Sequence, residues 1–155
     1  MKAHPYGIVD PFLRVDIADG ILEEIFKITG QLKIRACLIF GLCLGFVRDG
    51  GYIEGDNDLD IGVICNEESK DRLINSLKKN GFNQGKSYRH NNTHFYKNKV
   101  LVDILFRESG KFYSNLEGVH YKGKEYPVPS PVGEYLSACY SNWKIKENQA
   151  TRYYD

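Results

Sequence analysis

The chain of 155 residues has no long apolar segment, no C-x-x-C motif and no excess of charge of either sign. None of its apolar runs approaches the roughly 20 residues that a membrane-spanning helix needs, so no transmembrane segment is expected. The four cysteines lie mostly within apolar runs, which indicates buried free thiols in a reducing, cytoplasmic compartment and argues against structural zinc. With 21 basic and 20 acidic residues, the chain has no basic stripe of the kind that binds duplex nucleic acid.

The length favours one domain, and 42% hydrophobic residues is ordinary for a globular chain. Apolar periodicity and turn residues predict helices and strands in alternation along the chain. The first expected helix starts near Asp10 or Asp16 and ends at Gly30. Two further helices are expected over 42–48 and 66–81, and a last one begins at about Ser130. The expected strands cover 34–40, 59–65, 82–89, 93–96 and 100–106, followed by a hairpin-like stretch ending at 126–129. This order predicts an α/β or α+β fold in which helices cover a mixed sheet.

The segment between Arg48 and Lys70 is strongly acidic, with seven acidic residues and no lysine or arginine. Asp58 and Asp60 stand two residues apart in a strand-like run, so their carboxylates point to the same face. Two unneutralised carboxylates about 4 Å apart repel by roughly 4 kcal/mol at an effective dielectric constant near 20. Such repulsion beside an apolar run indicates a bound cation, and oxygen ligands suit Mg²⁺ better than zinc.

Asp103 is a lone charged residue inside an apolar strand covering 100–106. Burying such a carboxylate is costly unless it is paired or binds a metal. The alternatives are a buried pair with an arginine, a turn cap, or an edge-strand position facing water. Together with Asp58 and Asp60, however, Asp103 can bind one or two divalent ions. We therefore expect the two acidic strands to be neighbours in the sheet. The turn at Gly41, which follows the expected strand over 34–40, should lie at the same end of the sheet. The bound ions would neutralise a di- or triphosphate there.

These residues resemble the nucleotidyltransferase (polymerase-beta-like) superfamily, whose pattern is hG[GS], then [DE]h[DE]h, then h[DE]h. The run from Gly41 to Asp60 is similar to the LicD/fukutin-related branch, with its G-T-L-L-G-x-x-R and W-D-D-D-I-D segments. The tail from Tyr126 to Trp143 is similar to the closing segment of that branch. The resemblance spans roughly residues 15–145. The chain departs from it at three positions, where Leu42, Gly55 and Asn57 replace the usual Ser or Thr, Trp and Asp.

The resemblance implies a nucleotidyltransferase fold in a single domain over residues 1–155. It also implies an enzyme that depends on Mg²⁺ (or Mn²⁺). The donor would be an NTP or a CDP-alcohol, and the acceptor a hydroxyl group, for example on a cell-surface glycan that receives phosphocholine. Asp58 and Asp60 would hold the metal, while Asp103 would complete a second site and help to deprotonate the acceptor.

Three further residues follow from the same resemblance as donor-binding candidates. The backbone N–H groups of Gly41 and Leu42 would bind phosphate at a helix start. Arg48 would reach phosphate or hold the acidic loop, and an ion pair with Asp49 or Asp56 is an equally good interpretation of this arginine.

Two other functions remain open from the sequence. The first is a minimal nucleotidyltransferase that modifies a small molecule, such as an aminoglycoside, or a protein. The second is a catalytically inactive binding module on the same fold, for which Leu42 and Asn57 leave room. The donor, the acceptor and the oligomeric state are left undecided by the sequence.

Overall fold

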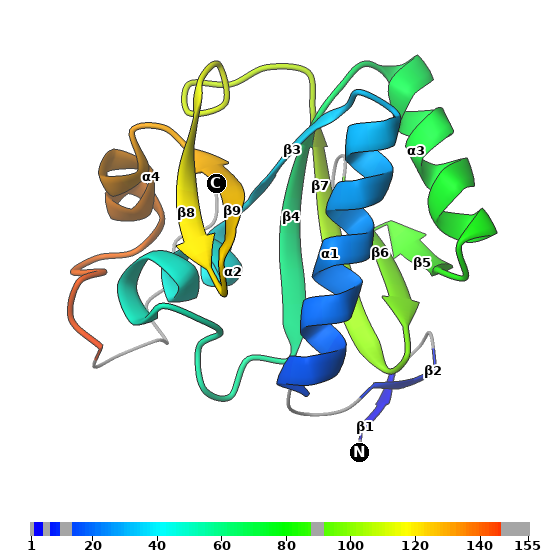
Figure 1. The fold of residues 1–155 in the computed structure, drawn as a ribbon, viewed down its shortest axis with the longest axis horizontal. Coiled ribbons are helices and arrows are strands. Elements are labelled where there is room, and N and C mark those ends of the chain that lie inside the picture. Colours follow the sequence, from blue (N-terminus) through cyan, green and yellow to red (C-terminus); the bar gives the residue numbers. More distant parts are fainter. Residues whose placement is uncertain (1, 5–6, 10–13, 88–91, 147–155) are drawn as a thin grey trace.

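The structure is a computed structural model that describes residues 2–4, 7–9, 14–87 and 92–146 (Figure 1). Its helical elements are α1 (Val15–Gln31), α2 (Phe40–Leu44), the π-helical turn η1 (Gly45–Asp49), α3 (Glu67–Lys79) and α4 (Val132–Cys139). Its strands are β1 (Lys2–His4), β2 (Gly7–Val9), β3 (Arg35–Leu38), β4 (Asp58–Ile64), β5 (Asn83–Ser87), β6 (Asn92–Lys97), β7 (Val100–Arg107), β8 (Leu116–Tyr121) and β9 (Lys124–Pro129).

The centre of the molecule is a five-stranded mixed sheet in the order β3-β4-β7-β6-β5. Strands β4 and β7 are parallel to each other, and the other neighbouring pairs are antiparallel. Helix α1 runs across the front of this sheet in Figure 1, with α3 to its right. Helices α2 and α4 and the β8–β9 hairpin lie to the left of the sheet in the same view. The predicted fold class, a mixed sheet covered by helices, is therefore confirmed.

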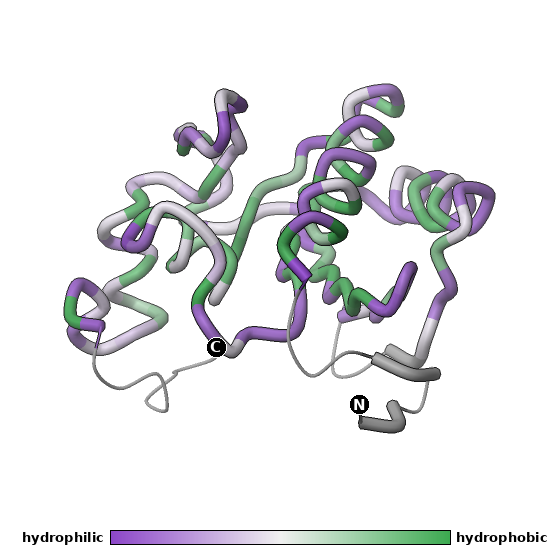
Figure 2. The backbone as a smooth tube through the Cα atoms, turned by 60° about the horizontal axis from the view of Figure 1, so that its bottom comes forward, coloured by the Kyte–Doolittle hydropathy of each residue, from purple (hydrophilic) through white to green (hydrophobic). Residues whose placement is uncertain are grey.

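The core forms where the apolar sequence patterns predict it. Helix α1 buries one stripe of apolar residues, and α3 buries Leu73 and Leu77. The Asn66 side chain caps α3 by accepting a hydrogen bond from the Ser69 backbone N–H at 2.9 Å. Figure 2 shows polar and apolar residues alternating along the helices. No helix in the described residues is long and apolar enough to cross a membrane.

The short helix differs from the predicted span of 42–48. Helix α2 begins earlier, at Phe40, and gives way to the wider π-helical turn at Gly45. A Cβ atom at Gly45 would lie 2.5 Å from the Gly51 carbonyl oxygen and 3.0 Å from the Ile53 nitrogen. The returning chain packs directly on the helix here, so tertiary contact rather than local propensity decides this geometry.

The N-terminal part of the chain shows one other difference from the sequence-based prediction. The β1–β2 pair was not predicted, because three-residue strands are too short to produce a clear alternating pattern. Helix α1 begins at Val15, close to the predicted start at Asp16. The other predicted start, at Asp10, lies outside the described residues.

A hydrogen-bonded cluster around Asp19 of α1 is one of the links between the β8–β9 hairpin and the rest of the fold. The Asp19 carboxylate accepts hydrogen bonds from Tyr52 at 2.7 Å, Tyr121 at 2.8 Å and Lys122 at 2.6 Å. The Tyr121 ring also stacks on Phe46 with centroids 4.4 Å apart. This cluster, defined here as the Asp19 network, joins α1, the segment after η1 and the hairpin.

Candidate metal and nucleotide site

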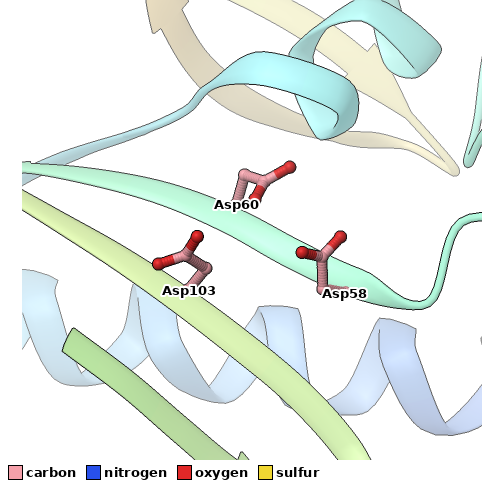
Figure 3. A group of neighbouring side chains, drawn as sticks. All are labelled: Asp58, Asp60 and Asp103. Carbon is pink, nitrogen blue, oxygen red and sulfur yellow. The ribbon is translucent and has the colours of Figure 1, made fainter. Parts of the chain in front are cut away.

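The three candidate acids converge on one side of the sheet. The parallel register of β4 and β7 pairs Asp60 directly with Asp103, and Asp58 lies two residues earlier on the same face. One carboxylate oxygen from each residue lies within 4.8 Å of those of the other two. Figure 3 shows the three side chains gathered over the two strands. The predicted convergence and the predicted strand neighbourhood are both confirmed.

The burial and chemistry of the three carboxylates fit a divalent cation. Asp60 is only 8% exposed, and Asp58 and Asp103 are half-buried. The Asp103 Oδ1 atom is buried and accepts no hydrogen bond from the described residues. Three carboxylates at this separation repel one another unless positive charge is supplied. An all-oxygen donor set is the set that Mg²⁺ and Mn²⁺ prefer, so these residues are suited to hold such an ion.

Gly41 lies against the acidic group, at the end of the sheet where it was predicted. A Cβ atom at this position would lie 2.9 Å from Asp56 Oδ2 and 3.6 Å from Asp60 Oδ2. The Asp56 carboxylate therefore approaches the same point as that of Asp60. The structure therefore places the Asp56 carboxylate beside the candidate metal site.

The turn that brings Gly41 to the acids depends on an unusual backbone conformation at Phe40. Its φ of 46° is in the left-handed region, which bulky residues rarely adopt. The Phe40 N–H donates a 2.9 Å hydrogen bond to the Tyr135 hydroxyl of α4, and the Ile39 N–H donates to the Asp60 carbonyl at 3.1 Å. These bonds hold the turn against β4. Nothing in the local sequence predicts this conformation, because phenylalanine has no preference for it.

The side chains of Leu42 and Arg48, the two other donor-binding candidates from the sequence, are engaged in the core and in an ion pair, respectively. Leu42 is 2% exposed, so its side chain belongs to the core and only its backbone could face a ligand. Arg48 donates two hydrogen bonds to Asp49, at 2.8 and 3.0 Å, and one to the Trp143 carbonyl. The bonds from Arg48 hold the pKa of Asp49 below its usual value. The Asp49 ion pair, one of the two interpretations of Arg48, is confirmed.

The structure resembles solved nucleotidyltransferases over most of its length. The lincosamide antibiotic adenylyltransferase LnuA in its lincomycin-bound form is 16% identical, with a TM-score of 0.62 over 83% of this chain and 89% of that one. The fold is that of the nucleotidyltransferases. The complex of ANT(2″)-Ia with adenylyl-2″-tobramycin is 11% identical, with a TM-score of 0.60 over 74% of this chain and 70% of that one.

A third structure with this nucleotidyltransferase fold is a putative nucleotidyltransferase from Thermotoga maritima. It is 16% identical and has a TM-score of 0.59 over 81% of this chain and 85% of that one. No protein-family model matches the sequence, and no curated protein matches it. The superfamily resemblance is thus supported at the level of fold, while the LicD-like branch receives no support from these comparisons.

Replacing Gly41 by alanine is expected to weaken metal binding more than it weakens the fold. The new methyl group would meet Asp56 Oδ2 at 2.9 Å and displace a flexible side chain next to Asp60. We expect a roughly tenfold loss of Mn²⁺ affinity, the scale of a disturbed outer partner at a metal site. The measurement is Mn²⁺ titration followed by calorimetry, together with the thermal midpoint of the metal-free protein.

The matched control for this variant is Gly20→Ala on α1. A Cβ atom at Gly20 has no neighbour within 4 Å, so alanine fits without displacement. It should raise stability by about 0.5–1 kcal/mol through its helix propensity and leave the Mn²⁺ affinity unchanged. Equal Mn²⁺ affinities for Gly41→Ala and Gly20→Ala would remove Gly41 from the site.

Proposed function

We propose that this chain, as a single domain over residues 1–155, is a metal-dependent nucleotidyltransferase. It would transfer a nucleoside monophosphate from an NTP to a hydroxyl group of a small molecule. The observation that carries the proposal is the group formed by Asp58, Asp60 and Asp103 on adjacent parallel strands of a nucleotidyltransferase fold. The small-molecule acceptor is supported by two structural neighbours, the lincosamide adenylyltransferase LnuA with lincomycin bound and ANT(2″)-Ia in complex with adenylyl-2″-tobramycin.

The acids have separate roles in this proposal. A bound Mg²⁺ or Mn²⁺ would neutralise the donor phosphates and align them with the attacking oxygen. Asp58 and Asp60, on β4, and Asp103, on β7, would hold the ion. The Asp103 carboxylate would accept the proton of the acceptor hydroxyl as that hydroxyl attacks the α-phosphate of the NTP, and pyrophosphate would leave.

The donor phosphates would lie over the turn at Gly41. The Cys43 N–H makes a hydrogen bond to the Ile39 carbonyl, which places the N–H groups of Gly41 and Leu42 ahead of this helical bond. These two backbone groups are assigned to phosphate binding. Arg48, which is occupied by Asp49, is assigned to holding η1 in place.

The test is a transfer assay with the full chain, Mg²⁺ and each of the four common NTPs. Lincosamide and aminoglycoside acceptors are incubated with the protein, and the products are analysed by mass spectrometry. We expect an acceptor mass increased by one nucleoside monophosphate unit, and no product with Asp60→Asn or with EDTA. A parallel reaction with CDP-choline tests the LicD-like alternative, which predicts that phosphocholine is transferred to the acceptor. Nucleotide binding without any transfer would instead indicate an inactive binding module.

A further inference from the structure

His94 of β6 lies directly opposite Asp103 in the sheet. The antiparallel register of β6 and β7 pairs the two residues, so their side chains emerge on the same face. His94 Nε2 lies 3.4 Å from Asp103 Oδ1, and the histidine side chain is 15% exposed. The imidazole therefore lies on the face of the sheet that carries the candidate metal ligands, next to the carboxylate of Asp103.

The two oxygens of the Asp103 carboxylate have different surroundings. Oδ1 is buried and accepts no hydrogen bond from the described residues, while the side chain as a whole is 23% exposed. The solvent-exposed part of the Asp103 side chain therefore consists of atoms other than Oδ1. A buried carboxylate oxygen is unfavourable without a donor, and His94 Nε2 is within a small side-chain rotation of hydrogen-bonding distance.

We propose that His94 is a positioning residue of the metal site. The Nε2–H group engages Asp103 Oδ1 and restricts the rotation of the carboxylate, so that the other oxygen remains available beside Asp58 and Asp60. Metal-ligating side chains are commonly oriented by such outer partners, and removal of one costs 10- to 100-fold in metal affinity. The inference rests on the proposed function, since it requires the acids to bind a cation.

The experiment measures Mn²⁺ affinity of the full chain by electron paramagnetic resonance. His94→Phe keeps the volume of a ring but removes the N–H, and we expect it to weaken Mn²⁺ binding by about 10- to 100-fold. His94→Gln places an amide N–H at a reach similar to that of Nε2, so it should recover most of the lost affinity.

The matched control is His120→Ala on the β8–β9 hairpin. His120 Nε2 lies 3.4 Å from Glu125 Oε2, the same separation as in the His94 pair, but the two side chains are 79% and 63% exposed. This variant should bind Mn²⁺ as the wild type does. Thermal midpoints in EDTA, measured in parallel, report any purely structural effect.

Each failure has its own meaning. Equal Mn²⁺ affinity in the wild type and His94→Phe overturns the positioning role, whether or not the thermal midpoint falls. Failure of His94→Gln to recover any affinity overturns the assignment of Nε2–H as the active group. If the wild type itself binds no Mn²⁺, the metal-dependent function proposed above fails, and the role of His94 fails with it.

Discussion

Replacing Asp60 by asparagine is expected to abolish nucleotidyl transfer without destabilising the metal-free protein. Asp60 is 8% exposed, and its carboxylate lies within 4.8 Å of those of Asp58 and Asp103. Without a cation, two charges about 4 Å apart repel by roughly 4 kcal/mol at an effective dielectric constant near 20, and asparagine removes this repulsion while keeping the shape. Under the proposed function, transfer would be lost because the cation that neutralises the donor phosphates would lose a ligand.

Two measurements check this expectation. The urea midpoint in EDTA should be equal to that of the wild type or slightly higher, and Mg²⁺-dependent nucleotide binding should fall sharply. Asp71→Asn, at an exposed position on α3, should change neither quantity. If Asp60 were instead half of a buried structural ion pair, asparagine would cost on the order of 3 kcal/mol. A lower urea midpoint with unchanged nucleotide binding would therefore contradict the catalytic role.

Replacing Asp19 by asparagine is expected to destabilise the protein by about 2 kcal/mol at pH 7, because the charged acceptor of three hydrogen bonds is lost. Burial by itself raises the pKa of Asp19, but hydrogen bonds from Lys122, Tyr52 and Tyr121 outweigh it and lower the pKa below the ordinary 3.8. Because the folded state binds this proton less readily, the stabilisation is present above pH 3.8 and is lost as the pH falls through the lowered folded-state pKa.

Urea unfolding of the wild type and Asp19→Asn, at pH 7 and at several lower values down to about pH 3, tests this. The difference in unfolding free energy between them should shrink as the pH falls. Glu23→Gln is the matched control on the same helix, since Glu23 and its partner Lys124 are 49% and 53% exposed. An exposed pair of this kind contributes less than about 1 kcal/mol. A difference for Asp19→Asn that stays constant with pH would contradict the ionised role of Asp19.

Much of the candidate site follows from strand periodicity. Because side chains alternate along a strand, Asp58 and Asp60 share a face wherever β4 lies in the sheet. Asp103 is the one charged residue in the otherwise apolar run 100–106, so the cost of burying its charge called for a partner or a metal. Their convergence was expected because three acids lie on apolar strands with no basic residue near the first two, and the observed register of Asp60 against Asp103 confirms it.

The surroundings of the acids did not follow from the sequence. The contact of His94 with Asp103 depends on the antiparallel register of β6 against β7, and a shift by one residue would turn His94 to the other face. The Asp19 network joins residues up to 103 positions apart, and no local pattern indicates such a pairing. Arg48 had two interpretations of equal weight until its hydrogen bonds to Asp49 were seen.

By itself, the sequence determined the long helices, the strands of the central sheet and the acids that are candidates for a metal, because periodicity and burial cost act over a few neighbouring residues. Only the tertiary structure decided how the chain turns between them. The left-handed backbone at Phe40 and the π-helical turn at Gly45 are held by Tyr135 and by the returning backbone of Gly51. These contacts are distant in sequence or specific to the packed chain, and they overcome the local preferences of the residues involved.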